Sequence, residues 1–280
     1  MSEVLIHQKI LQTIKADKSL LPATPEVGVK ILAAMDDPNC NVKVIAKVIK
    51  NDVGLSAFII KTAGSSRFAT LNPIKDLEGA IARMGLRETY HLSIAFLSRF
   101  VHKSSNRALQ KQLLATHKFS TKMAVIAFFL ANNTKKALPS QALLAGLFQD
   151  IGVPAILVAL SKHPDVFNDE TEKARCIDVL APKIGTMILQ QWGFEEDMIA
   201  VVKSRKNWLM DDEETGLPEL VLIGRLHAMI GSPEFKECPS LCDIPAFEKL
   251  NLGELGPDGT LDILLNSQQE ISDIQRSLGG

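Results

Sequence analysis

Neither sign of charge dominates this sequence of 280 residues. Its 31 Lys and Arg residues are matched by 32 Asp and Glu residues, which leaves a formal net charge of −1 at pH 7. A dedicated nucleic-acid-binding domain normally carries a strong basic excess, because much of its affinity comes from phosphate contacts. We therefore expect no nucleic-acid partner.

Long apolar runs are also missing. The longest uninterrupted apolar stretches are residues 123–131 and 153–160, well short of the ~18 residues that span a bilayer. The opening residues, MSEVLIHQKI, contain no cationic segment followed by an apolar core, so we expect no secretory signal. These observations predict a cytoplasmic protein with no membrane partner, whose four cysteines are reduced thiols.

Sequence motifs of common metal and nucleotide sites are scarce. Cys238 and Cys242 have a C-x3-C spacing, but no second Cys or His pair stands at a suitable spacing to complete a structural zinc site. No two histidines occupy positions i and i+4, and HExxH, Gly-rich phosphate loops and the GxSxG turn are all absent. We therefore expect neither a zinc site nor a parallel-sheet nucleotide fold.

Apolar residues recur at helical spacing along almost the whole chain. Val4, Ile10, Leu11 and Ile14, for example, share one stripe at spacings of three, four and seven. Convincing strand-like alternation is not found, so the pattern predicts an all-α fold. The expected helices cover residues 4–16, 25–36, 41–50, 55–63, 76–84, 86–101, 107–131, 140–148, 154–160, 178–191, 195–209, 218–230 and 260–277.

Several of these helices have recognisable starts. Thr24 before Pro25 predicts one N-cap, and Asn41 predicts another. Thr260 is placed to cap the last helix, which is amphipathic. That helix either packs on its own domain, as a stripe of this width usually does, or binds a partner. Its apolar face comprises Leu261, Leu264, Leu265, Ile271, Ile274 and Leu278.

One acidic residue stands at an unusual place. Asp150 directly follows the strongly apolar helix predicted at 140–148, in the sequence ALLAGLFQDIG. A carboxylate in such surroundings is costly unless it is paired. One interpretation is a helix-ending turn in which Asp150 accepts hydrogen bonds from nearby backbone N–H groups. The other depends on a resemblance to a known family.

Two stretches of the chain resemble the HDOD family of bacterial signalling domains, which are relatives of the HD and HD-GYP phosphohydrolases. The first runs from LPATPEVGVKIL through DVGLS to AIARMGL, similar to the family's Leu-Pro-x-x-Pro start, D-x-x-L-S/T turn and A-I-x-x-[LM]-G segment. The second is ALLAGLFQDIG followed by IGTMILQQWGF. The resemblance covers roughly residues 14–230.

This resemblance implies an all-helical domain in two lobes, the second of them HD-like. On that basis we expect an N-terminal lobe over residues 1–104 and an HD-like lobe over 105–232. A C-terminal extension over 233–280 would place its amphipathic helix on the domain.

The resemblance also allows the metal site of active HD enzymes to be compared position by position. Those enzymes bind divalent metals through a His, a His-Asp pair, often further His residues and a later Asp. An arginine stays protonated and cannot ligate a metal, so we expect no metal, no cofactor and no phosphohydrolase activity. The pocket left behind would comprise Phe119 (first His), Gln149 and Asp150 (His-Asp pair), Ser204 and Arg205 (further His) and Arg225 (later Asp).

The replaced positions lead to a specific hypothesis about charge. A buried Asp150 needs a positive partner, and Arg225 or Arg205 is placed to supply the charge that a metal supplies in the relatives. The alternative is that both arginine side chains point into solvent. The sequence does not decide which arginine would form the pair.

The resemblance and these replacements together favour a non-catalytic regulatory or scaffold module in bacterial signal transduction, which binds a protein partner or a small ligand. Weak candidates for a contact surface are residues 100–107, residues 203–216 and the last helix. One alternative is a metal-dependent phosphohydrolase in which His117, Asp150 and His227 converge. Another is a nucleotide sensor without hydrolysis, in which Arg205 and Arg225 bind a phosphate.

Overall fold

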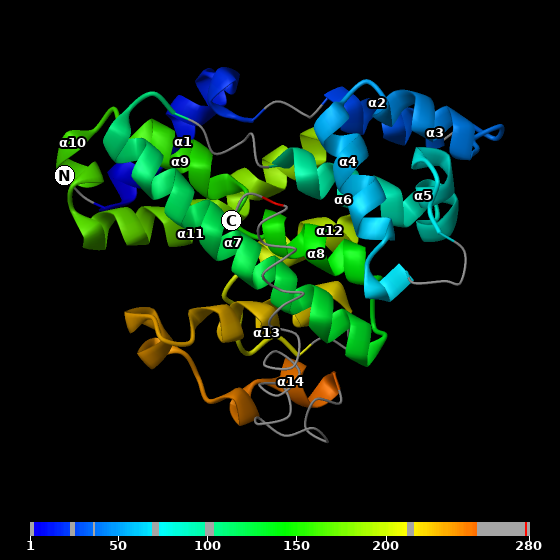
Figure 1. The fold of residues 1–280 in the computed structure, drawn as a ribbon. Helices are drawn as coiled ribbons and strands as arrows, with labels where there is room; N and C mark the ends of the chain where they lie inside the picture. Colours follow the sequence, from blue (N-terminus) through cyan, green and yellow to red (C-terminus); the bar gives the residue numbers. More distant parts are fainter. Residues whose placement is uncertain are drawn as a thin grey trace. The chain divides into compact units, whose positions relative to one another are not determined.

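The computed structural model describes residues 3–22, 26–35, 37–68, 73–98, 104–211, 216–250 and Leu278. Within these ranges the regular structure is helical and no β-strand occurs, so the predicted all-α class is confirmed (Figure 1). The α-helices are α1 (Glu3–Ala16), α2 (Glu26–Met35), α3 (Val42–Ile49), α4 (Val53–Ala63), α5 (Leu77–Met84), α6 (Leu86–Leu97), α7 (Arg107–Thr134), α8 (Pro139–Phe148), α9 (Gly152–Leu160), α10 (Pro164–Phe167), α11 (Glu170–Gln191), α12 (Glu196–Lys203), α13 (Leu217–Met229) and α14 (Pro245–Lys249). Short 3-10 helices are η1 (Lys18–Leu20), η2 (Ser66–Phe68), η4 (Pro233–Glu237) and η5 (Leu241–Asp243).

The chain divides into two compact units. The smaller unit comprises Thr24–Arg99, with helices α2 to α6, and also the segment Ser277–Gly279. The larger unit comprises Met1–Ala23 and Phe100–Arg276, with α1 and the helices from α7 onward. Each unit has its own apolar core.

In the smaller unit, local capping defines where helices begin. The Asn41 side chain accepts hydrogen bonds from the backbone N–H groups of Lys43 and Val44 at 3.0 and 3.2 Å, as the sequence predicted for this cap. Asp52 and Asp76 do the same at the starts of α4 and α5. Such side chains satisfy N–H groups that have no partner inside the helix.

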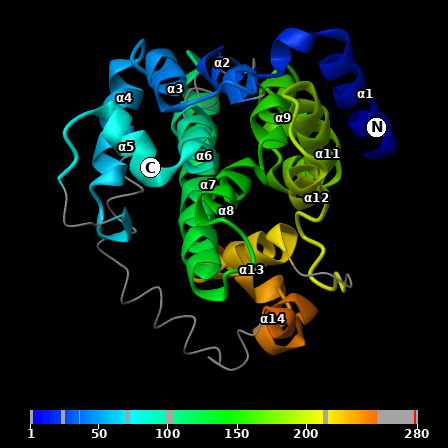
Figure 2. The ribbon, with the colours of Figure 1, turned by 90° about the vertical axis from the view of Figure 1, so that its right-hand side faces the viewer.

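In the larger unit, α7 and α8 lie side by side (Figures 1 and 2). Their close approach depends on Gly146, where an added Cβ atom would lie only 2.4 Å from the Cα of Ala124. The facing part of α7 is almost completely buried, from Met123 to Ala131. This packing forms the centre of the larger unit and fixes the direction of the chain as it leaves α8.

A second close contact joins α9 to α11, which lie side by side in Figure 2. An added Cβ atom at Gly152 would lie 2.6 Å from the carbonyl oxygen of Ala181 and 2.8 Å from the backbone N of Gly185. Helix α1 also packs against α9 and α11, and so belongs to the larger unit, whereas the sequence analysis assigned it to the N-terminal lobe. An amphipathic stripe shows that a helix face is buried but does not identify what covers it.

Two helix boundaries differ from the predicted ones by more than four residues. Helix α11 begins at Glu170 instead of 178, because the Asp169 side chain caps it through the N–H groups of Thr171 and Glu172. The predicted helix over 195–209 is wrong beyond Lys203, where a turn follows α12. Helices α10 and α14 were not predicted, since elements of four or five residues have too short a pattern to read.

Two helical stretches, Arg107–Thr134 and Pro139–Leu160, are long and apolar enough to cross a membrane by length and composition. The count of uninterrupted apolar residues had not identified them. Both are mostly buried inside the larger unit. The core helix of a globular protein can have the same length and apolar composition. The predicted cap at Thr24 and the predicted helix over 260–277 lie outside the described residues. Leu278, which was predicted to belong to the apolar face of that helix, is described and is helical and buried.

Candidate functional site

A cavity of about 360 Å³ opens in the larger unit among α7, α9, α11 and α13. Four of the six residues predicted for the vestigial pocket line it: Phe119, Asp150, Arg205 and Arg225. Val153, Ile177 and Met229 contribute much of its apolar surface. Residues that are far apart in the sequence therefore share one site.

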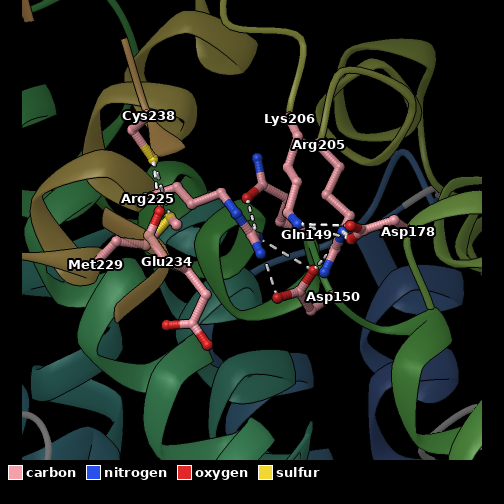
Figure 3. Close-up of polar contacts among 9 residues, drawn as sticks. All are labelled: Gln149, Asp150, Asp178, Arg205, Lys206, Arg225, Met229, Glu234 and Cys238. Atoms are coloured by element: carbon pink, nitrogen blue, oxygen red, sulfur yellow. Dashed lines mark hydrogen bonds and ion pairs between the residues drawn. The ribbon is translucent and has the colours of Figure 1, made fainter. Parts of the chain in front are cut away.

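The centre of this site is a buried ionic cluster (Figure 3). The Nη1 of Arg225 donates to both carboxylate oxygens of Asp150, at 3.1 and 3.0 Å. The Nε of Arg205 donates to Oδ1 of the same carboxylate. All three residues are at most 5% exposed. The hypothesis of an ion pair at Asp150 is therefore confirmed, and both arginines form it.

Gln149 and Phe119 complete the surroundings of Arg225. The Oε1 of Gln149 accepts a hydrogen bond from Arg225 Nη1 at 2.9 Å. The guanidinium carbon of Arg225 lies 5.1 Å from the centroid of the Phe119 ring, within the range of a cation–π contact. The amide of Gln149 and the phenyl ring of Phe119 therefore both stabilise Arg225.

Two further charged residues belong to the cluster but were not predicted as members of the pocket. Asp178, on α11, accepts a hydrogen bond from Arg205 Nη1 at 2.7 Å. Lys206 Nζ lies 2.7 Å from Oδ1 of Asp178 (Figure 3). Neither residue belongs to a motif, and the only available indication was that a buried guanidinium needs more acceptors than one carboxylate provides.

The chain turn between α8 and α9 positions Asp150. Helix α8 ends at Phe148, and the backbone oxygen of Asp150 accepts the first bond of the next turn, from Val153 N at 2.9 Å. The side chain is thus bonded to distant arginines, and the interpretation of a purely local cap is not supported. Because Gly152 allows α9 to approach α11 closely, Asp150 comes within reach of the Arg205–Asp178 pair.

The electrostatics of the site favour charged forms. Burial alone would raise the pKa of the Asp150 carboxyl, but the charges and hydrogen bonds of Arg205 and Arg225 outweigh burial and hold that pKa well below its usual range. Burial likewise opposes ionisation of Asp178, and its hydrogen bonds to Lys206 and Arg205 lower its pKa. The carboxyl groups of Asp150 and Asp178 are therefore ionised at neutral pH.

Three other residues considered from the sequence do not line the cavity. Ser204 turns back, and its hydroxyl donates to the backbone oxygen of Ala200 at 2.8 Å. His117 is buried within α7, and His227 bonds through Nδ1 to its own helix, at 2.9 Å from the oxygen of Ile223. Among the residues that line the cavity in the described part of the chain there is no histidine.

The residues of this site do not fit the divalent metal that the HD resemblance implies. Such an ion needs several converging oxygen or imidazole ligands. Both oxygens of Asp150 already accept bonds from guanidinium groups, and those groups cannot ligate a metal. Within the described ranges, no three His, Cys, Asp or Glu side chains are grouped so that they could hold an ion. Cys238 and Cys242 are free thiols, the second of them exposed.

Comparison with solved structures shows where this fold has been seen before. A Shewanella amazonensis SB2B protein named "putative metal-dependent phosphohydrolase" is 20% identical and superposes with a TM-score of 0.79 over 99% of each chain. An HDOD domain protein of unknown function from Geobacter sulfurreducens is 18% identical, with a TM-score of 0.64 over 98% of each chain. A "putative signal transduction protein" of Marinobacter aquaeolei VT8 is 16% identical, with a TM-score of 0.64 over all of this chain and 67% of that one. The predicted all-α fold of HDOD type is thereby confirmed.

Comparison of sequences points the same way. An uncharacterised protein of Treponema pallidum (strain Nichols) is 25% identical over 197 residues, which are 67% of this chain and 38% of that protein. This chain thus matches well under half of the length of that relative. The profile of the HDOD domain matches residues 21–208, more than half of this chain. The chain therefore belongs to the HDOD domain family.

Proposed function

We propose that this chain is a non-catalytic regulatory or scaffold module of bacterial signal transduction, which binds a protein partner or a small ligand. The observation that carries the proposal is the pairing of the Asp150 carboxylate with two arginines. Asp150 is the one carboxylate that remains at the positions of the HD metal ligands, and two arginines occupy its oxygens.

Hydrolysis of a phosphate ester by the HD route needs a metal ion that lowers the pKa of a bound water. Here the positive charge beside Asp150 comes from guanidinium groups, which stay protonated and activate no water. The guanidinium groups balance the charge of the buried carboxylate, but they do not activate a water molecule for hydrolysis. This reasoning supports a module that keeps the fold and has lost the reaction.

The signalling role is supported by family membership and by the name of the Marinobacter relative. The near balance of charges supports a partner other than nucleic acid. We also propose that the module works in the cytoplasm and without a membrane partner. Its partner or ligand would then be a cytoplasmic signalling protein or metabolite.

The second candidate is a phosphohydrolase, which the name of the Shewanella relative favours. It would require His117, Asp150 and His227 to converge on a metal ion. Neither histidine lines the cavity that holds Asp150, which is the main argument against this candidate. The third candidate, a nucleotide sensor without hydrolysis, shares its cavity with the inference drawn below.

The proposal is tested by assaying hydrolysis of bis(4-nitrophenyl) phosphate with added Mn²⁺, Mg²⁺ or Ni²⁺. We expect no release of nitrophenol above that of buffer with the same metal. The matched variants are Asp150→Asn, in the site, and Asp76→Asn, which makes the same change at a helix cap of the smaller unit. Metal-dependent hydrolysis that disappears in Asp150→Asn but persists in Asp76→Asn would establish the phosphohydrolase instead.

A further inference from the structure

Arg225 uses only part of its hydrogen-bonding capacity. A guanidinium carries five N–H donors in a planar fork, yet the bonds to Asp150 and Gln149 all use Nη1. The Nε of Arg225 is buried and has no partner among the described residues. The Oγ of Ser232 is also buried without a partner in that part of the chain, and both residues line the cavity. Buried donors of this kind are costly until an acceptor reaches them.

The charges around the cavity limit which acceptor fits. Its lining carries three basic groups, on Arg205, Lys206 and Arg225, and three acidic groups, on Asp150, Asp178 and Glu234. These charges cancel, so a ligand of high negative charge would meet three carboxylates without a net attraction. A phosphate monoester carries a charge of about −1.5 to −2 at neutral pH. A carboxylate carries one charge and matches the planar fork of an arginine.

Most of the remaining residues that line the cavity are apolar. Phe119, Val153, Ile177 and Met229 line it beside the charged groups. Its volume of about 360 Å³ lies in the range of small-molecule sites, which combine an apolar lining with a few placed polar groups. The shape and lining suit a ligand with one acidic end and an apolar body.

We propose that this cavity binds a small organic carboxylate with an apolar body, whose oxygens accept hydrogen bonds from Arg225 and Ser232. The inference names the ligand class of the proposed regulatory module, and so it rests on that proposal. The Asp150 cluster (Figure 3) then has a role in recognition, because it holds Arg225 in place beneath the ligand.

The test is titration of the full chain with sodium benzoate and sodium hexanoate, followed by ligand-observed NMR and calorimetry. Benzamide and hexanamide are the matched neutral probes, and inorganic phosphate is the highly charged probe. We expect saturable binding of both carboxylates. The amides should bind about tenfold or more weakly, because they lose the charge of the carboxylate that accepts the hydrogen bonds. Phosphate should also bind about tenfold or more weakly, because it brings more negative charge among three carboxylates and has no apolar body.

Variants connect binding to the named residues. Arg225→Lys keeps the charge and removes the fork, and we expect it to weaken benzoate binding by about tenfold. Ala174→Trp adds a bulky side chain to the cavity lining on α11, and should abolish binding even if Arg225→Lys fails to fold. Arg175→Lys, on the same helix but outside the cavity lining, is the matched control and should bind as the unaltered chain does.

Two results would overturn the inference: benzamide or phosphate binding as tightly as benzoate, or benzoate binding that survives Ala174→Trp. Absence of carboxylate binding would overturn it as well. In all these cases the proposed non-catalytic function stands if hydrolysis is still absent. Metal-dependent hydrolysis would instead overturn the proposed function itself.

Discussion

The helix caps of the smaller unit and the ionic cluster of the larger unit use polar residues in different ways. In the smaller unit, Asn41, Asp52 and Asp76 cap helices through backbone N–H groups two or three positions away. In the larger unit, Asp150 is bonded to Arg205 and Arg225, which lie 55 and 75 positions further along the chain. The first kind of contact organises one helix, and the second joins several.

This difference has energetic consequences. When a capping side chain at the surface is lost, water can form hydrogen bonds with the N–H groups that it had capped. A buried ion pair is different, because removal of one partner leaves an uncompensated charge inside the protein. The comparison teaches that the Asp150 cluster is sensitive to single substitutions in a way that the caps are not, and four predictions test it.

The largest effect is expected for Asp150→Asn. This change leaves two buried guanidinium groups without their shared carboxylate, and should lower the free energy of unfolding by about 3–5 kcal/mol. The matched change Asp76→Asn should lower it by less than about 0.5 kcal/mol, since Asn caps a helix as well as Asp does. Urea unfolding measures both. Similarly small losses of stability in the two variants would show that the cluster is no more sensitive to substitution than the cap.

The effect of Asp150→Asn should depend on pH. The folded state lowers the pKa of Asp150, so its contribution to stability is complete above the unfolded pKa of about 3.9 and is lost as the pH falls through the lower folded value. The difference in stability between the unaltered chain and Asp150→Asn should therefore be constant from neutral pH to about pH 5 and shrink below about pH 4. Urea unfolding curves measured across this pH range show whether the stability difference shrinks or grows on acidification. A difference that grows on acidification would contradict it.

A moderate effect is expected where α9 approaches α11 closely, at Gly152. Gly152→Ala would place a methyl group against the backbone of Ala181 and Gly185, which cannot move aside. We expect this change to lower the free energy of unfolding by about 1–3 kcal/mol. In the smaller unit, an added Cβ at Gly64 meets only ordinary contacts at 3.5 Å and beyond. Gly64→Ala should thus change stability by less than about 1 kcal/mol. Thermal unfolding of the pair is the measurement, and equal losses would show that close packing does not distinguish these positions.

The smallest effect is expected at a single cap. Asp76→Ala removes the acceptor of the Gly79 N–H bond, which measures 2.7 Å, and should lower stability by about 1 kcal/mol. Glu26→Ala, which breaks only the exposed pair with Lys30, should leave stability nearly unchanged. If Asp76→Ala proves as damaging as Asp150→Asn, local and long-range polar contacts are equivalent here.

The same contrast explains what the sequence could predict. Helical class and the cap at Asn41 depend on residues a few positions apart, so periodicity and residue type were sufficient. Asp150 was identified because a carboxylate after an apolar helix needs a partner. Its two arginines were named as alternatives, and only the folded chain brings both to it.

Other parts of the site could not be predicted. Asp178 and Lys206 join the cluster through the packing of α11 beside α12, and neither carries a local signal. Ser204 was placed in the pocket on the strength of its register, but α12 ends just before it and its hydroxyl bonds to that helix. Positions carried over from a distant family identify the helix more reliably than the direction of a side chain.

The central proposal is that two arginines occupy positions at which the resemblance to HD enzymes implies metal ligands. Its most direct test is elemental analysis of the purified protein by inductively coupled plasma mass spectrometry, after growth in metal-supplemented medium. The account predicts less than about a tenth of an equivalent of Mn, Fe, Ni or Zn, because the site offers too few ligands. Near-stoichiometric metal that disappears in Asp150→Ala would contradict it.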